Sequence, residues 1–348
     1  MQFGDLTLDQ KNCFVIGEIG LNHNGSVELA EKMVYESLIA GATLVKFQKR
    51  TPSVLARAEY LDQPFVKAPS MGTTQREVRE RHELSRDEYR HIFKYAEDLG
   101  LIPFATAFDI ASLDFLVNEV GCKYIKIASH SATNGLLVAK ALESKLPLVI
   151  SMGATKPSER TILKDMIDTY NGQVVVMHCV SEYPTASKNM NLDSISLLQE
   201  EFGNNCVGFS SHEIGYTGTL AAVALGAVLV ERHITMSKAM VGLDHGISME
   251  ASEFAQMVLQ IKEINKMRGV KLEISAEEMN VRNSYHCGMY ARKDLVQGVD
   301  LNVDMFEIVQ PLGGDDSLTS IEFMGMDIKK LNTSLKSGDQ LKRWMIDP

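Results

Sequence analysis

Eight short apolar runs, rich in Val, Ile and Phe, recur along this chain, and that repeat limits its possible folds more than any other feature. They cover residues 13–18, 43–48, 102–107, 123–129, 146–153, 173–180, 206–212 and 228–235. Longer amphipathic segments lie between them, as at 27–42 and at 85–100, where Ser85 and Glu88 match a helix capping box. Eight strands that alternate with helices predict an α/β fold, a parallel (β/α)8 TIM barrel.

The remaining segments fit around this barrel. An open doubly wound sheet is the alternative fold, but no GxGxxG turn follows the first strand. Residues 49–84 are too long for an ordinary connection and predict a functional or interface loop. From about residue 283 the pattern changes to short strands and turns. We therefore expect a barrel domain over 1–282 and a small β-rich domain over 283–348.

Composition narrows the class of protein. The 348 residues carry a formal net charge of −10, which argues against nucleic acid as a general partner. No apolar run reaches the roughly 20 residues needed to cross a bilayer, and the first residues lack a signal-peptide pattern. The five cysteines stand far apart, which favours buried reduced thiols. We expect a soluble, cytoplasmic protein without a membrane partner.

Polar residues stand where the expected strands end. In chain order they are Glu18, Lys46 with Gln48, Thr106, Lys126 with Ser129, Ser151, Ser181 with Tyr183, Ser210 with His212, and His233. The reacting groups of a TIM barrel gather at the carboxyl ends of its strands, so these side chains would face one mouth. A single Ser or Thr at a strand end commonly satisfies a backbone group instead. The coincidence over eight strands predicts a site.

Two lysines indicate the charge of the ligand. Lys46 and Lys126 interrupt strands that are otherwise apolar, and a buried lysine is costly unless it is paired. With the neighbouring hydroxyl groups, they suit a phosphate, or a phosphate and a carboxylate. The alternative is a pair of structural ion pairs with Asp or Glu from neighbouring strands.

Two histidines suggest a metal ion. His212 closes the seventh expected strand and His233 lies in the eighth, so adjacent strands could bring both imidazoles to one point. Two His with water and substrate oxygens suit a divalent ion such as Mn, Fe, Co or Zn in an open site. A hydrogen-bonded core histidine or a general base is the alternative for each.

In these motifs and in their order the chain resembles the sialic acid synthase family. The matching motifs are EIGLNHNGS, VKFQ, KIAS, SMG, HCVSEYPT, GFSSHEIG and ERHIT, followed by Gly242, Leu243 and Asp244. The similarity covers nearly the whole chain. It includes a C-terminal part, over 283–348, that is similar to the antifreeze-like (SAF) domain.

The resemblance implies a transferase that condenses phosphoenolpyruvate (PEP) with an N-acyl hexosamine aldehyde such as N-acetylmannosamine. The products would be a nine-carbon 2-keto sugar acid, sialic or another nonulosonic acid, and phosphate. The implied PEP contacts are Lys46, Thr106, Lys126, Ser129, Ser151, Ser181 and Ser210. The implied ligands of a divalent ion, Mn²⁺ in the family, are His212 and His233. The implied sugar contacts are Glu18, Tyr183, Asp244 and Gln310. The implied catalytic groups are Glu18, Lys126, His233 and Asp244.

Two residues depart from the family's pattern. Many members carry an acid two residues after the serine of the KIAS motif, where this chain has Ser131. Bacterial members that use N-acetylmannosamine carry an arginine before the proline of the C-terminal domain, where this chain has Gln310. Glutamine lacks the charged fork of arginine, so the identity of the sugar stays open. The resemblance also implies a domain-swapped homodimer.

Other functions compete with this one. A metal-free aldolase could use Lys126 as a Schiff base. A synthase for phosphorylated sugars would need a second phosphate site, which the sequence alone does not locate. A sugar-binding barrel without activity would bind ligands without turnover.

Overall fold

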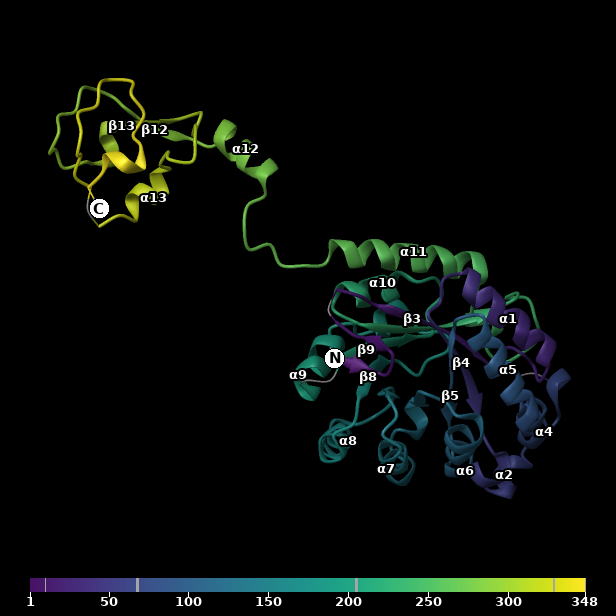
Figure 1. Ribbon diagram of the computed structural model, residues 1–348. Coiled ribbons are helices and arrows are strands. Elements are labelled where there is room, and N and C mark those ends of the chain that lie inside the picture. The colour runs from purple at the N-terminus through teal and green to yellow at the C-terminus, as the bar shows by residue number, and fades with distance from the viewer. Residues whose placement is uncertain (10, 67–68, 204–205, 328, 348) are drawn as a thin grey trace. The chain divides into compact units, whose positions relative to one another are not determined.

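The computed structural model describes residues 1–9, 11–66, 69–203, 206–327 and 329–347. The chain divides into two compact units, Met1–Gly269 and Val270–Pro348 (Figure 1). The first unit holds the long sheet and most of the helices. The second unit is small and contains two short paired strands.

The first unit is a closed barrel of eight parallel strands. They are β3 (Phe14–Gly20), β4 (Leu44–Lys49), β5 (Ile102–Ala107), β6 (Ile125–Ile127), β7 (Leu148–Ser151), β8 (Val174–Cys179), β9 (Cys206–Ser211) and β10 (Leu229–Thr235). Each strand pairs with the next, and β10 pairs with both β9 and β3, which closes the ring. The predicted TIM barrel is therefore confirmed. A two-residue strand, β11 (Met249–Glu250), extends the sheet beside β10.

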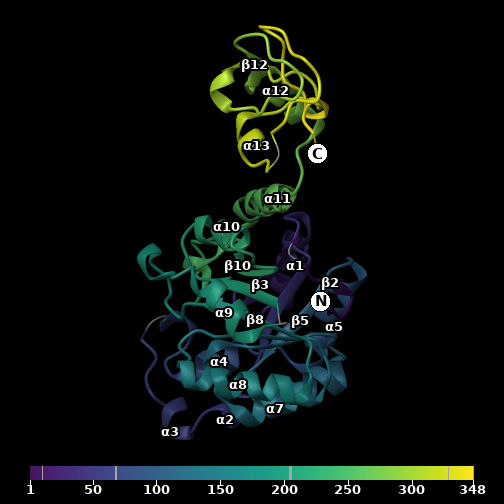
Figure 2. The ribbon, with the colours of Figure 1, turned by 90° about the vertical axis from the view of Figure 1, so that its left-hand side faces the viewer.

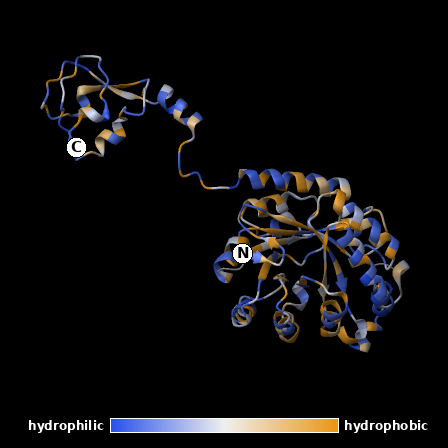
Figure 3. Cartoon of the chain, in the orientation of Figure 1, coloured by the Kyte–Doolittle hydropathy of each residue, from blue (hydrophilic) through white to orange (hydrophobic). Residues whose placement is uncertain are grey.

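Helices cover the outside of the barrel (Figures 1 and 2). They are α1 (Val27–Ile39), α5 (Arg86–Asp98), α6 (Ile110–Phe115), α7 (Gly135–Glu143), α8 (Pro157–Tyr170), α9 (Ser194–Phe202), α10 (Thr217–Ala224) and α11 (Ala251–Met267). The capping box predicted at Ser85 and Glu88 is present at the start of α5. Figure 3 shows apolar strands inside and helices with one apolar and one polar side.

Apolar side chains fill the barrel interior toward the end opposite the polar strand ends. Phe104, Tyr124 and Met177 belong to this cluster, and Phe3 of an N-terminal hairpin packs into it. The hairpin pairs β1 (Gln2–Phe3) with β2 (Leu6–Thr7). The sequence did not predict this hairpin, which closes the end of the barrel opposite the strand ends that carry the polar residues.

Among its described residues, the long segment 49–84 contains three short α-helices, α2 (Pro52–Leu55), α3 (Ala58–Leu61) and α4 (Gln75–Arg81), and a short 3-10 helix at Pro69–Met71. Residues 67 and 68 of the segment lie outside the described residues. The helix α4 begins at an N-cap, Thr74, whose hydroxyl accepts from the Glu77 amide. The expected loop is thus a partly helical insertion after β4.

The second unit begins with α12 (Ala276–Tyr285) and continues through β12 (Gly288–Ala291), β13 (Phe306–Val309) and α13 (Ser320–Met324). Its own core packs mainly leucine side chains around Phe306 and Phe323. The domain boundary expected between 282 and 283 falls inside α12. Among the described residues, none of the helices is both long and apolar enough to cross a bilayer.

Candidate active site

A cavity of about 200 Å³ lies at the carboxyl ends of the barrel strands. The predicted site residues that line it are Glu18, Lys46, Thr106, Lys126, Ser129, Ser151, Tyr183, Ser210, His212, His233 and Asp244. Ser181 instead lines a neighbouring hollow, together with Cys179, which lines both. Gln310 belongs to the second unit, where its side-chain amide donates to the Tyr285 carbonyl. The barrel therefore brings most of the predicted residues together.

The two lysines are buried and ion-paired. Lys46 Nζ lies 2.7 Å from Glu18 Oε2 and 3.5 Å from Glu231 Oε1, and Lys126 Nζ lies 2.7 Å from Glu231 Oε2. The carboxylate partners that the sequence left as an alternative are thus present, and they line the same cavity as the lysines. Two ammonium groups face two carboxylates, so this inner cluster is formally neutral.

Opposing effects set the protonation of these groups. Burial raises the pKa of Glu18, although Lys46 opposes that shift. The pKa of Glu231 falls to about 2, because attraction to Lys126 and Lys46 outweighs its burial. Burial lowers the pKa of Lys126, although Glu231 opposes that shift. Glu231 is accordingly the fixed negative charge of the cluster, and Glu18 is the carboxylate more easily protonated.

Hydroxyl groups surround the lysines. Lys46 Nζ donates to Thr106 Oγ1 at 2.8 Å, and the Gly153 amide donates to Ser129 Oγ at 3.0 Å. The Ser151 hydroxyl is buried without a hydrogen-bond partner among the described residues. A Cβ at Gly153 would lie 2.5 Å from Ser181 Oγ and 2.8 Å from Ser129 Oγ, so a side chain here would displace these hydroxyl groups and glycine is required. The Ser151 hydroxyl, unpartnered within the described chain and near the other serine hydroxyls of the cavity, suits a bound anion.

The two histidines lie next to each other in the cavity wall, His212 just after β9 and His233 in the adjacent strand β10. The ring centroids of His212 and His233 are 5.6 Å apart. His212 Nδ1 lies 3.0 Å from the Val180 carbonyl, and His233 Nδ1 is buried without a hydrogen-bond partner in the described part of the chain. Burial and the nearby His233 lower the pKa of His212 to about 3, so its ring is neutral.

These features fit a metal bound by two imidazoles. A ligating histidine commonly directs its other ring nitrogen to a backbone carbonyl, as His212 does toward Val180. Among the described residues, no group of three or more His, Cys, Asp or Glu side chains could hold a metal. Water or substrate oxygens would have to complete the coordination, as in an open catalytic site. Tyr183 packs over His212, with ring centroids 3.9 Å apart.

The polar residues at the end of β3 and just after it have two different roles. Glu18 lines the cavity, where its Oε1 accepts from Gln48 Nε2 at 2.8 Å. Asn22 instead donates to the Ile234 carbonyl at 2.8 Å and to Ser248 Oγ at 2.7 Å. Asn24 donates to the Val241 carbonyl at 3.0 Å. These two asparagines hold the loop that carries Asp244.

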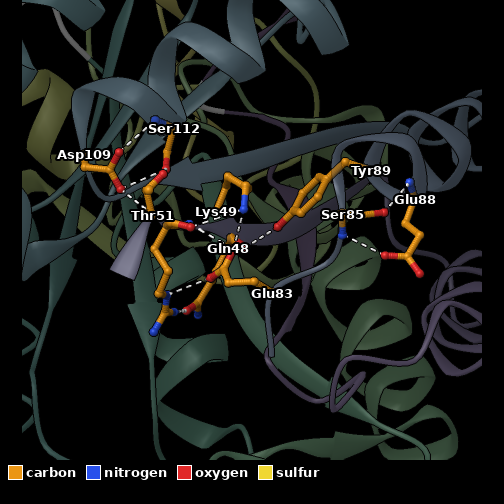
Figure 4. Close-up of polar contacts among 10 residues, drawn as sticks. Gln48, Lys49, Thr51, Glu83, Ser85, Glu88, Tyr89, Asp109 and Ser112 are labelled. Carbon is orange, nitrogen blue, oxygen red and sulfur yellow. Dashed lines mark hydrogen bonds and ion pairs between the residues drawn. The ribbon is translucent and has the colours of Figure 1, made fainter. Parts of the chain in front are cut away.

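The prediction from sequence missed several cavity residues. Glu231 lies two residues before His233 in β10, and strand alternation places both on one face, which was a usable signal. Arg50, Phe108 and His130 also line the cavity. Their positions after strand ends gave no comparable signal. Just outside the cavity, Glu83 accepts from Lys49 Nζ at 2.6 Å (Figure 4).

Comparisons with known proteins find relatives over most of this chain. Residues 33–273 match the model of the NeuB family. The N-acetylneuraminate-9-phosphate synthase of Drosophila melanogaster is 33% identical over 341 residues, covering 91% of each chain. The N,N'-diacetyllegionaminic acid synthase of Legionella pneumophila is 32% identical over 337 residues, covering 94% of this chain and 93% of the relative.

A solved structure matches as well. The N-acetylneuraminic acid synthetase of Leptospira borgpetersenii, crystallised with citrate, superposes with a TM-score of 0.71 and 30% identity. The match covers 82% of this chain and 96% of that one. Similarity in sequence and in fold thus points to the same group of proteins.

Proposed function

Because the chain belongs to the NeuB family, we propose that it condenses PEP with an N-acyl hexosamine aldehyde to give a nine-carbon 2-keto sugar acid and phosphate. The observation that carries this proposal is the single cavity in which two lysines, a row of hydroxyl groups and two histidines meet. The named relatives are synthases of N-acetylneuraminate 9-phosphate, of N,N'-diacetyllegionaminic acid and of sialic acid, which are related to this class of product.

The lysines and hydroxyl groups would bind PEP. Lys46 and Lys126 supply positive charge, and Ser129 and Ser151 supply hydrogen bonds. Each lysine already has a carboxylate partner, so an arriving phosphate competes with that carboxylate. Since burial raises the pKa of Glu18, this group can take up a proton as the anion approaches Lys46.

The histidines would serve the aldehyde. A divalent ion, Mn²⁺ in our proposal, held by His212 and His233 would polarise the aldehyde oxygen as a Lewis acid. Tyr183 limits the movement of the His212 ring, and the Val180 carbonyl fixes which ring nitrogen faces the cavity. These contacts orient the site before substrates bind.

Two carboxylates could assist the changes in bonding during this reaction. C3 of PEP forms a bond to the aldehyde carbon, which leaves positive charge at C2. The former aldehyde oxygen takes the negative charge and is protonated to a hydroxyl. Water adds to C2 and loses a proton, and the bond from C2 to the phosphate oxygen then breaks as the added hydroxyl loses its remaining proton and becomes the keto group. Glu18 and Asp244 are the cavity carboxylates available to stabilise the cation and accept the proton of the water.

Product analysis tests the proposal against the Schiff-base aldolase. With PEP, N-acetylmannosamine and Mn²⁺, mass spectrometry should show a product that contains both carbon skeletons and no phosphate. Treatment with pyruvate and borohydride should leave the protein mass unchanged. A pyruvate adduct on Lys126 would instead support the aldolase.

Two further parts of the proposal rest on the family resemblance. We propose that the second unit contains the antifreeze-like domain and that the enzyme is a cytoplasmic homodimer in which Gln310 serves a sugar site. Light scattering of the purified protein would measure the oligomeric state. A monomer at the concentrations used for assays would remove the dimer from the proposal.

A further inference from the structure

Two buried, charged residues stand directly beside the proposed metal ligands in the chain and have no task in the reaction. Glu213 follows His212, and Arg232 precedes His233. Their side chains are 3% and 1% exposed, and Arg232 Nη1 lies 3.1 Å from Glu213 Oε1. Because side chains alternate along a strand, Arg232 lies on the opposite face of β10 from Glu231 and His233, which line the cavity. The Arg232–Glu213 pair therefore links the end of β9 to β10 on the side turned away from the cavity.

The ladder between β9 and β10 ends before it reaches the histidines. The last residues paired between these two strands are Ser211 and Arg232, and β9 itself ends at Ser211. His233, by contrast, is still paired with Glu18 of β3. The sheet thus holds His233 in place, whereas His212 lies one residue beyond the strand that carries it.

Other contacts of His212 lead away from β10. Its carbonyl accepts from the Thr185 amide at 3.0 Å, and its Nδ1 lies 3.0 Å from the Val180 carbonyl. Both partners belong to the segment that follows β8, which is the neighbour of β9 on the side away from β10. The polar contact that leads back to β10 is made by the next residue, Glu213.

Arg232 binds both the side chain and the backbone of Glu213. Its Nη1 donates to Glu213 Oε1 at 3.1 Å and to Thr219 Oγ1 at 2.9 Å, and its Nη2 donates to the Glu213 carbonyl at 2.8 Å. The same carboxylate accepts from the Gly218 and Thr219 amides at 2.8 Å, at the start of α10. A planar guanidinium with several donors fixes direction as well as distance. The backbone just after His212 is thus tied to β10 and to α10.

Stability is a weak reason for a charged pair at this place. Arg232 Nε is buried without a hydrogen-bond partner among the residues that the structure describes. The cost of desolvating a buried ion pair offsets much of its attraction, and apolar residues of similar volume are often equally stabilising. Hydrogen bonds directed at both the carboxylate and the carbonyl of Glu213 favour a role in geometry instead.

We infer that Arg232 and Glu213 are positioning residues, which hold the imidazoles of His212 and His233 in the arrangement that lets them share one divalent ion. The inference rests on the proposed function, because it takes these imidazoles to be the metal ligands. Neither residue of the pair lines the cavity, so neither would touch the ion or the substrates. Residues that orient metal ligands in this way commonly change metal affinity by about tenfold to a hundredfold when they are replaced.

Binding of Mn²⁺ to the full chain, without substrates, tests this assignment. The electron paramagnetic resonance signal of free Mn²⁺ measures the affinity, and the binding that is lost in His212→Ala is the binding assigned to the site. The double variant Arg232→Met with Glu213→Gln leaves no buried charge alone and keeps an acceptor for the α10 amides, so it should fold. It should bind Mn²⁺ about tenfold to a hundredfold more weakly than the wild type. Arg232→Lys keeps the charge and part of the hydrogen bonds, so it should lose less affinity than the double variant.

A second pair of the same chemistry is the matched control. Arg160 of α8 donates to both carboxylate oxygens of Glu201 of α9, at 2.8 and 2.9 Å. Neither residue adjoins a proposed ligand, so Arg160→Met with Glu201→Gln should leave the Mn²⁺ affinity within about twofold of the wild type. Circular dichroism would establish that each variant is folded. Calorimetry in EDTA would then measure PEP binding, which should change much less than Mn²⁺ binding in the Arg232 and Glu213 variants.

Three results would overturn the inference. Equal Mn²⁺ affinity in the wild type and in the folded Arg232 and Glu213 double variant would remove the positioning role. A parallel loss of PEP affinity would make the pair a general support of this end of the barrel. A wild-type protein without Mn²⁺ binding that depends on His212 would refute the inference together with the proposed metal site.

Phosphate release from PEP keeps the inference apart from the proposed reaction. If Mn²⁺ binding weakens as expected in the double variant but the wild type releases no phosphate with any sugar, only the reaction is refuted. If the wild type releases phosphate and the double variant binds Mn²⁺ normally, only the inference is refuted.

Discussion

Removing the Glu231 carboxylate should destabilise the barrel strongly. Glu231 is the shared partner of Lys126, at 2.7 Å, and of Lys46, at 3.5 Å. The side chains of Glu231 and Lys126 are 7% and 2% exposed, so Glu231→Gln leaves a buried ammonium group without its main partner. Breaking a buried pair in this way costs about 3–5 kcal/mol.

A double-mutant cycle measures how much of that cost belongs to the pair. At 2.7 Å the Coulomb attraction of the two charges is about 6 kcal/mol for an effective dielectric constant of about 20, most of which offsets desolvation. Lys126→Met removes the other charge. The double variant should therefore be more stable than the sum of the single losses predicts, by up to about 3 kcal/mol.

The assay is urea unfolding of the four proteins followed by far-UV circular dichroism. The chain has one tryptophan, Trp344 of the second unit, so its fluorescence would not report on the barrel. Asp114→Asn is the control, because Asp114 lies 2.7 Å from Lys140 with both side chains well exposed. Exposed pairs contribute about 0–1 kcal/mol. The reasoning would be refuted if the stability losses of the Lys126→Met and Glu231→Gln variants summed to the loss of the double variant within about 0.5 kcal/mol.

The direction of the effect can be predicted for three further substitutions. Burial, and then His82, lower the pKa of the His23 imidazole to about 4. As the pH falls from 6.5 to 4, the imidazole is therefore protonated in the unfolded chain but not in the folded one, and the free energy of unfolding falls by about 1.4 kcal/mol per pH unit. His23→Gln should flatten the pH dependence of urea unfolding, and parallel curves would contradict this. Gln310→Arg should raise kcat/KM for N-acetylmannosamine. Gln297→Arg, in the same unit, is the control and should not raise it. An unchanged sugar preference in Gln310→Arg would contradict a role for residue 310 in sugar selection. Lys126→Ala should abolish phosphate release while circular dichroism stays native, and a folded, active variant would remove that lysine from the PEP site.

The barrel could be predicted because its strands obey a local rule. Parallel strands buried on both faces are almost wholly apolar, so polar residues such as Lys46 and Lys126 stand out within them. The carboxyl ends of the strands all lie at one end of a parallel barrel. The positions of His212 and His233 in their strands were therefore enough to predict that both line one cavity.

Features that depend on contacts across the barrel could not be predicted. Lys126 and Glu231 are 105 residues apart in the chain, and nothing local shows that they pair. Arg50 follows its strand in a segment where only the folded structure reveals the stack on Phe108. The N-terminal hairpin has strands of two residues, too short for any periodic pattern.

The most direct test of the proposed synthase is phosphate release from PEP in the presence of Mn²⁺, across a panel of N-acyl hexosamines and their phosphates, each repeated in EDTA. The cavity that joins the proposed PEP site to two histidines predicts release that requires both a sugar and the metal. The preferred sugar would also show what Gln310 selects. Tight PEP binding without release for any sugar would contradict the synthase and favour a barrel that binds its ligands without turnover.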